Sequence, residues 1–206
     1  ILFRTNLGIR FVMDALMKGG IPFHMKDAIP NLFAHWISLD IIAYLRLVSG
    51  TGNTRANWLR IMNRPNRYIK REALAPFTSD ISVAQLKAYY QDKDWMLERL
   101  DRLEYDLSIM KRMSPYAAIH YLSNAMKYQD YLKDYAKEHH INEQELLDVL
   151  NAVHESSQSC RTFAEWFTYI DTYTEELQKQ AKSPASNDAN NESGVCLCTL
   201  HCAKGL

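Results

Sequence analysis

The chain has strand-like segments at its two ends and a long stretch of helical sequence between them. Residues 1–3, 21–25 and 195–199 have the pattern of short apolar strands. From about residue 80 to 181, apolar side chains recur almost throughout at helical spacing. This arrangement predicts a mainly α fold, with a helical insertion and a small partial α/β portion containing a few parallel strands. We expect residues 1–3 and 195–198 to be neighbouring strands, because both are short and apolar.

The first 25 residues have the order strand, helix, strand. Asn6 can cap a helix over residues 7–18, and Gly19 with Gly20 can end it. A helix that joins two strands of one sheet makes those strands parallel. A few short strands cannot bury the faces of a sheet by themselves. We therefore expect these strands to belong to a larger sheet, and the sequence to be a fragment that lacks part of it.

The central region predicts a series of helices. They are expected at about residues 36–48, 54–62, 82–90, 94–112 and 128–138, and three further helices follow typical start signals. Those signals are Ser114 with Pro115, Asn142 with Glu145, and Thr162 with Glu165. The last helix should end near residue 181. Residues 183–194 lack an apolar face and predict a mobile linker.

Composition is that of an ordinary globular protein, with 47% hydrophobic and 23% charged residues. No apolar run approaches the roughly 20 residues of a membrane span, so no membrane partner is expected. Three of the four cysteines fall within residues 196–202, which is not the spacing of a disulfide framework. A reducing, cytoplasmic location is therefore expected.

Charge is distributed unevenly although the net charge is zero. Residues 1–75 contain eleven Lys and Arg against four Asp and Glu, which suggests that this third of the chain faces an anion. Six of the basic residues lie between Arg55 and Arg71, with no acid among them and with Trp58 and Tyr68 interleaved. This stretch can hold a nucleic-acid backbone, or it can be a solvated basic face with Trp58 in the core.

Polar residues at strand ends are the remaining candidates for a site. Arg4 directly follows the first strand, where a guanidinium suits a phosphate, although such an arginine is also common on surfaces. After the last strand, Thr199 and His201 can hydrogen-bond phosphate, and Gly205 allows a close backbone approach. Zinc binding is a weaker alternative for this end, with four possible ligands: Cys196, Cys198, His201 and Cys202.

Several segments, in this order, resemble the UvrD/Rep/PcrA group of superfamily 1 DNA helicases. Residues 2–6 resemble motif IV, and residues 20–23 resemble the GIPY strand that follows it. Residues 40–47 are similar to the DILAYLRL helix, and residues 58–67 to the LLRIINxPxRGIG segment. Residues 199–206 are nearly motif V, TLHxAKGLEF. Between residues 67 and 195, little beyond helical character is shared.

The resemblance implies roles for individual residues. In this family ATP binds with Mg²⁺ between two RecA-like domains, and closing the cleft drives movement along single-stranded DNA. Arg4 matches the arginine that contacts the γ-phosphate, which makes it the expected catalytic residue, and Gly205 matches a residue near the nucleotide. The expected DNA-binding residues are Asn63, Arg67, Thr199 and His201; no metal ligand is expected.

Two departures from the family pattern affect these expectations. Tyr68, Ile69 and Lys70 replace the Gly-Ile-Gly after the arginine, which puts the phosphate contact of that turn in doubt. The 206 residues also contain neither a G-x-x-x-x-G-K-[ST] loop nor a Walker B acid pair. The fragment is therefore expected to be inactive alone and to need no cofactor of its own.

The resemblance implies a division of the chain into domains. Residues 1–67 and 195–206 would be parts of the second RecA-like (2A) motor domain, and residues 68–193 the helical 2B insertion. The whole protein would be an ATP-dependent 3′-to-5′ DNA helicase. Its partners would be single-stranded DNA, junctions with duplex, and its own N-terminal RecA-like domain. The alternative is a helical interaction module of a helicase–nuclease complex, or an inactive helicase-like protein.

Overall fold

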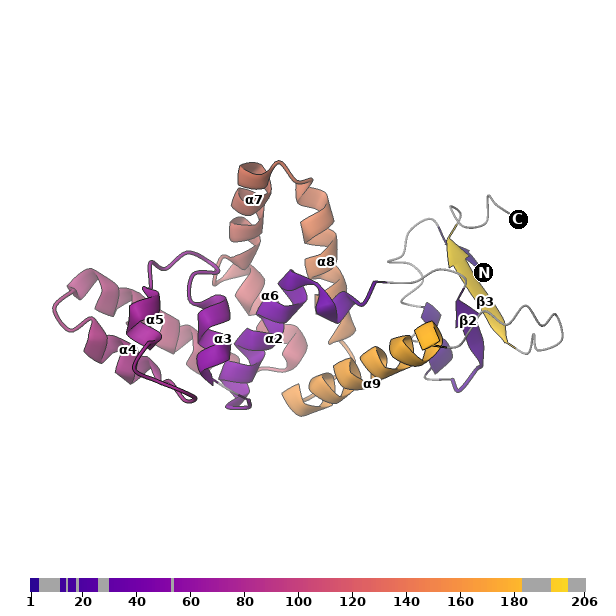
Figure 1. Cartoon of the computed structure of the whole chain (residues 1–206), viewed down its shortest axis with the longest axis horizontal. Coiled ribbons are helices and arrows are strands. Elements are labelled where there is room, and N and C mark those ends of the chain that lie inside the picture. The colour runs from indigo at the N-terminus through magenta and orange to yellow at the C-terminus, as the bar shows by residue number, and fades with distance from the viewer. Residues whose placement is uncertain are drawn as a thin grey trace. The chain divides into compact units, whose positions relative to one another are not determined.

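The fold is mainly helical with a small parallel sheet, as the sequence predicts (Figure 1). A computed structural model describes residues 1–3, 12–13, 15–17, 19–25, 30–52, 54–182 and 194–199. The chain forms two compact units. One contains Ile1–Asn31 and Tyr169–Leu206, and the other contains Leu32–Thr168.

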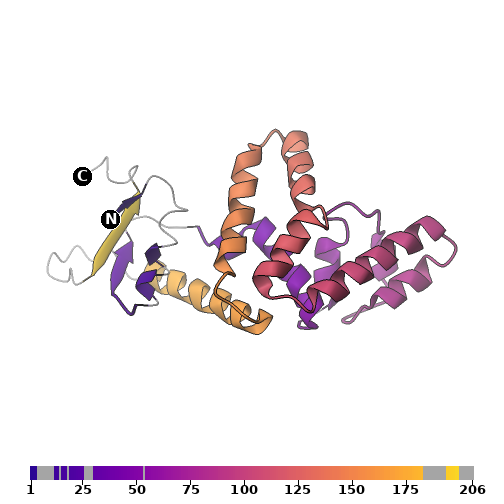
Figure 2. The same ribbon diagram turned by 180° about the vertical axis from the view of Figure 1, so that it is seen from behind.

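The first unit contains the sheet. Strand β3 (Val195–Thr199) lies between β1 (Leu2–Phe3) and β2 (Phe23–Met25), and both pairings are parallel (Figures 1 and 2). Leu2 pairs with Cys198, which confirms that the first and last strands are neighbours. Strands β1 and β2 are parallel, as expected, but each of them pairs with β3 and they do not pair with each other.

Apolar side chains of the central strand and of the helical residues 12–13 and 15–17 are buried in this unit. Leu197 in the central strand is fully buried. Residues 12–13 and 15–17 are helical, and Met13 and Leu16 among them are buried, as expected for the apolar face of the predicted helix. The rest of that predicted helix and residues 183–193 of the predicted linker lie outside the described residues.

The second unit is built from helices. In chain order the elements are η1 (Leu32–Ala34), α2 (Trp36–Ser49), α3 (Thr54–Ile61), η2 (Arg71–Leu74), α4 (Val83–Tyr89), α5 (Asp94–Met110), α6 (Pro115–Asn124), α7 (Tyr128–His139), α8 (Glu143–Ser156) and α9 (Phe163–Lys182), the last of which continues into the first unit. The predicted start signals are present, because Ser114 accepts a hydrogen bond from the backbone N–H of Ala117 and Asn142 accepts one from that of Gln144.

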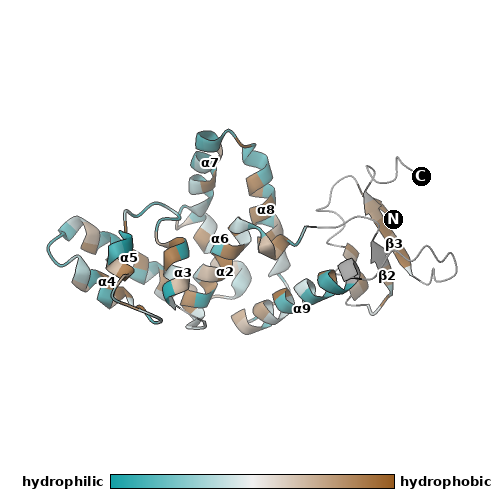
Figure 3. Ribbon diagram, viewed as in Figure 1, coloured by the Kyte–Doolittle hydropathy of each residue, from teal (hydrophilic) through white to brown (hydrophobic). Residues whose placement is uncertain are grey.

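Helix α2 is the centre of the second unit. It begins where the His35 side chain accepts a hydrogen bond from the backbone N–H of Ile37, and it ends at Gly50, whose φ of 71° suits glycine. Its residues Ile41 and Tyr44 have no exposed surface. It packs against α3, α5, α6 and α8. Figure 3 shows hydrophobic residues on α2 and α3 and hydrophilic ones over much of α7.

The boundaries of the two compact units differ from the boundaries of the predicted domains. Residues 32–67, predicted as part of the motor domain, lie in the helical unit. The reason is packing: α2 contacts α5, α6 and α8, which come after residue 67 in the sequence, as well as its neighbour α3. Which residues act as motor domain and which as insertion stays a prediction. Within the described ranges, no helix combines the length and the apolar character that crossing a membrane requires.

Candidate nucleic-acid interface

Residues 62–70 form a loop between α3 and η2, and the Asn63 side chain holds it together. Its Oδ1 accepts hydrogen bonds from the backbone N–H groups of Ile69 at 2.9 Å and Arg67 at 3.3 Å. Its Nδ2 donates to the carbonyl oxygen of Ile69 at 2.9 Å. Asn63, a predicted DNA-contacting residue, is therefore engaged in shaping the loop on which it lies.

Arg67 also stabilises this loop from within. Its Nη1 donates to the carbonyl oxygens of Ile61 and Pro65, each at 3.2 Å. Its guanidinium carbon lies 5.7 Å from the ring centre of Tyr44, which is fully buried. Tyr44 in turn donates its hydroxyl to the carbonyl oxygen of Arg64 at 2.7 Å. A direct contact between Arg67 and DNA stays a prediction; the contacts here show a role in loop structure.

Asp40 on α2 anchors the start of the same loop. Its side chain has no exposed surface and lies 2.9 Å from Nε of Arg60 and 2.8 Å from Nη1 of Arg64. The other carboxylate oxygen accepts a hydrogen bond from the Tyr128 hydroxyl at 2.9 Å. Arg60 and Arg64, whose side chains are 32% and 38% exposed, therefore each have one side toward a buried carboxylate and another toward water.

The environment shifts the protonation of these groups in directions that follow from burial and charge. Burial raises the pKa of Asp40 above its usual value, although Arg64, the Tyr128 hydroxyl and Arg60 act in the opposite direction. Burial, followed by the charge of Asp40, raises the pKa of Tyr128 well above its usual value. Tyr128 is therefore a hydrogen-bond donor to Asp40 and stays neutral over the physiological range.

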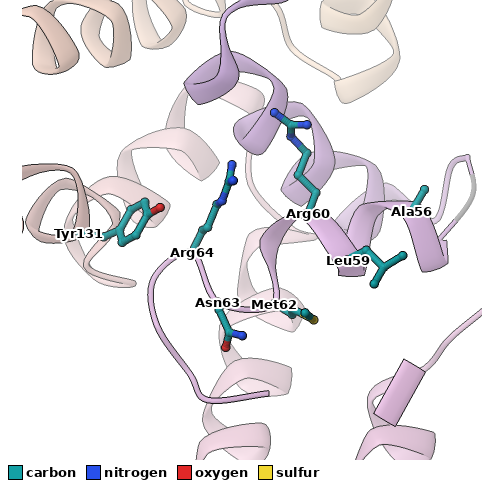
Figure 4. Close-up of a pocket in the computed structure, with 7 residues that line it drawn as sticks. All are labelled: Ala56, Leu59, Arg60, Met62, Asn63, Arg64 and Tyr131. Carbon is teal, nitrogen blue, oxygen red and sulfur yellow. The ribbon is translucent and has the colours of Figure 1, made fainter. Parts of the chain in front are cut away.

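The two arginines border a pocket of about 450 Å³. Figure 4 shows Arg64 between Tyr131 and Arg60. The residues that line the pocket are Ala56, Leu59, Arg60, Met62, Asn63, Arg64 and Tyr131. Two guanidinium groups share the single carboxylate of Asp40, so the wall of this pocket has one net positive charge. A partly exposed cationic pocket of this kind can hold a phosphate group.

A second pocket on the same loop has the opposite character. It has a volume of about 520 Å³ and lies between the loop residues Asn63, Pro65 and Asn66 and the exposed face of α7. The other lining residues are Lys127, which directly precedes α7, and the α7 residues Asp130, Tyr131, Asp134, Tyr135 and Glu138. Three carboxylates against one lysine repel a phosphate backbone. The loop thus has an acidic side toward α7.

The remaining predicted site residues lie at the edge of the described structure or outside it. Thr199 is the last residue of β3, where it pairs with Phe3. Arg4, His201 and Gly205 lie outside the described residues. Cys196 and Cys198 are free thiols in β3, and no group of metal-binding side chains occurs in the described part of the chain. The other two ligands of the zinc alternative, His201 and Cys202, fall outside that part.

Sequence reasoning missed the importance of Asp40 and Tyr128. An aspartate in a helix is usually solvent-exposed, and Tyr128 is 88 residues away in the sequence. A signal was available, however. Asp40 stands between Leu39 and Ile41 in an otherwise apolar segment, and a charged residue on a buried helix needs partners.

Comparison with known proteins places this architecture in a family. The UvrD-like helicase C-terminal domain family matches residues 1–206. The chain therefore belongs to the UvrD-like helicase C-terminal domain family, which confirms the resemblance seen in the sequence motifs.

Curated relatives are DNA helicases of bacteria. The chain is 24% identical to the putative ATP-dependent DNA helicase YjcD of Bacillus subtilis over 212 residues, which is all of this chain and 26% of that protein. It is 25% identical to the ATP-dependent DNA helicase PcrA of B. subtilis over 222 residues, or 29% of that protein. PcrA of Staphylococcus epidermidis is 23% identical, again with 29% covered. The chain thus spans between a quarter and a third of the length of these relatives.

Proposed function

We propose that this chain is part of an ATP-dependent DNA helicase that moves 3′ to 5′ along single-stranded DNA. The observation that carries the proposal is the pocket at Arg60 and Arg64, whose wall has a net positive charge beside the ordered 62–70 loop. In this proposal a backbone phosphate lies in the pocket near Asn63. Arg67 contributes by holding the loop in place.

The nucleotide side of the proposal rests on the family resemblance. Arg4 would contact the γ-phosphate of ATP, bound with Mg²⁺ and the N-terminal RecA-like domain of the same protein, and Gly205 would lie near the nucleotide. Thr199 and His201 would face the DNA backbone. In this proposal the protein is cytoplasmic and acts at junctions between single-stranded and duplex DNA. The fragment would be inactive by itself.

Unwinding by the full-length protein tests the proposed function. With ATP and Mg²⁺, the protein should separate a duplex with a 3′ single-stranded tail and leave a 5′-tailed duplex intact. Arg4→Ala should lower ATP turnover by roughly a thousandfold, because an arginine finger stabilises transition-state charge, and should leave DNA affinity nearly unchanged. Arg112→Ala, which changes an exposed arginine two residues after the end of α5, is the control. Unwinding of the 5′-tailed duplex alone, or no unwinding, contradicts the proposal.

A further inference from the structure

Two exposed aromatic rings meet one exposed guanidinium on the side of the 62–70 loop that faces α5. The guanidinium carbon of Arg99 lies 5.0 Å from the ring centre of Tyr68 and 5.0 Å from that of Trp95. Tyr68 is 60% exposed and Trp95 is 50% exposed. Trp95 and Arg99 are four residues apart and so share one face of α5, while Tyr68 reaches them from the loop. The two rings and the guanidinium thus form one contiguous exposed cluster, whereas single exposed aromatic side chains are common.

The backbone of Tyr68 indicates that this exposure is built into the loop. Its φ of 60° is in the left-handed region, which is unfavourable for a bulky side chain. Hydrogen bonds hold this conformation at Tyr68 itself and at a residue that follows it. Its N–H donates to Oδ1 of Asn66 at 3.1 Å, and the N–H of Lys70 donates to the Tyr90 hydroxyl at 2.7 Å. The ring is thus presented at the surface by a rigid frame, which lowers the entropy lost on binding.

Charge decides which kind of ligand fits this surface. The pocket between the loop and α7 that contains Asp130, Asp134 and Glu138 is acidic and disfavours a phosphate group. The α5 side has the guanidinium of Arg99 near both rings, and Lys70, two residues after Tyr68 in the sequence, is exposed. Asp94 and Glu98 are also on α5 and balance Arg99 and Lys70, so these four side chains carry no net charge. A guanidinium beside open aromatic faces, with no net charge around it, suits unpaired nucleobases, which stack on rings irrespective of sequence.

We propose that Tyr68 and Trp95 form a stacking platform for unpaired bases of single-stranded DNA, with Arg99 fixing both rings by cation–π contact. This inference rests on the proposed DNA-binding function and adds to it the residues that hold the bases. The phosphate pocket and the stacking platform would then bind different parts of one strand.

Binding of the full-length protein to an oligothymidylate, and to the same strand with abasic sites, tests the platform. Tyr68→Asn keeps a residue that tolerates positive φ, and Trp95→Ala removes the second ring. Each should weaken oligothymidylate binding about tenfold, as expected for the loss of one stacked base. Neither should weaken binding to the abasic strand, because that strand has no bases to stack. Tyr68→Phe should bind like the wild type.

The control is Tyr105→Asn, which removes an exposed ring elsewhere on α5 and should leave binding unchanged. If wild-type protein binds oligothymidylate but Tyr68→Asn and Trp95→Ala bind equally well, the platform is refuted and the helicase proposal stands. If the two variants weaken binding to the abasic strand as much as binding to oligothymidylate, the platform is also refuted. Such a result would mean that the rings support the folded structure and do not stack on bases. If the wild type binds no single-stranded DNA, both proposals fail.

Discussion

At the residue scale, the buried carboxylate of Asp40 organises the candidate interface. It connects α2 to Arg60 near the end of α3, to Arg64 in the 62–70 loop and to Tyr128 at the start of α7. Pairing does not by itself mean that such a charge stabilises the fold, because taking ions out of water is costly. Removing the carboxylate is nevertheless unfavourable, since Arg64 and Tyr128 then lose their hydrogen bonds to it inside the protein.

Asp40→Ala should therefore lower the free energy of unfolding by about 3 kcal/mol. Most of this loss comes from the buried Tyr128 hydroxyl, which is left without its acceptor, because Arg60 and Arg64 can turn toward water. Urea unfolding of the chain, followed by circular dichroism, measures the change. Asp130→Ala, at an exposed position on α7, is the matched control and should change stability by less than about 0.5 kcal/mol. If Asp40→Ala lowers the free energy of unfolding no more than Asp130→Ala does, Asp40 does not organise this part of the fold.

At the element scale, the 62–70 loop has its shape fixed by its own side chains. Asn63 bonds to the backbone of two loop residues, and Arg67 bonds to two carbonyl oxygens. These bonds place the acidic side of the loop toward α7 and Tyr68 toward α5. A loop held in this way can present ligand groups on two faces without reorganising when it binds.

Asn63→Ala removes three of these bonds and should open the loop without unfolding the helices. The amide of Ile69 should exchange with solvent about tenfold faster or more, which corresponds to a loss of roughly 1.4 kcal/mol of local protection. Hydrogen exchange measured by mass spectrometry or NMR checks this expectation. Asn151→Ala, at an exposed position on α8, is the control. Unchanged exchange at Ile69 would mean that the loop is ordered by other contacts.

At the scale of the whole molecule, the sequence predicts the elements better than their assembly. Helical periodicity identifies α2 and α5 because each keeps apolar residues facing its neighbours. Pairing of residues 1–3 with 195–198 was also predictable, because both strands are short and apolar. The position of β3 between β1 and β2 was not, since strand order is set by contacts between residues distant in sequence.

The candidate site shows the same limit of sequence reasoning. Residue type indicates that Arg67 can bind phosphate, but not that its Nη1 bonds to carbonyl oxygens of its own loop. The boundary between the compact units lies near residue 32, because α2 packs against α5, α6 and α8, whereas the functional boundary after residue 67 stays a prediction. Motifs therefore identified the family, whereas the role of each side chain required its three-dimensional contacts.

The salt dependence of single-stranded DNA binding tests the proposed phosphate pocket most directly. In the full-length protein, the logarithm of the binding constant should fall linearly with the logarithm of salt concentration. Arg60→Gln removes one of the two guanidinium groups that border the pocket and leaves Asp40 paired with Arg64 and Tyr128. It should reduce the steepness of the slope by about 0.7, the value for one phosphate contact on a single strand. Arg112→Gln should keep the wild-type slope, and an Arg60→Gln slope equal to the wild type's would contradict a phosphate in this pocket.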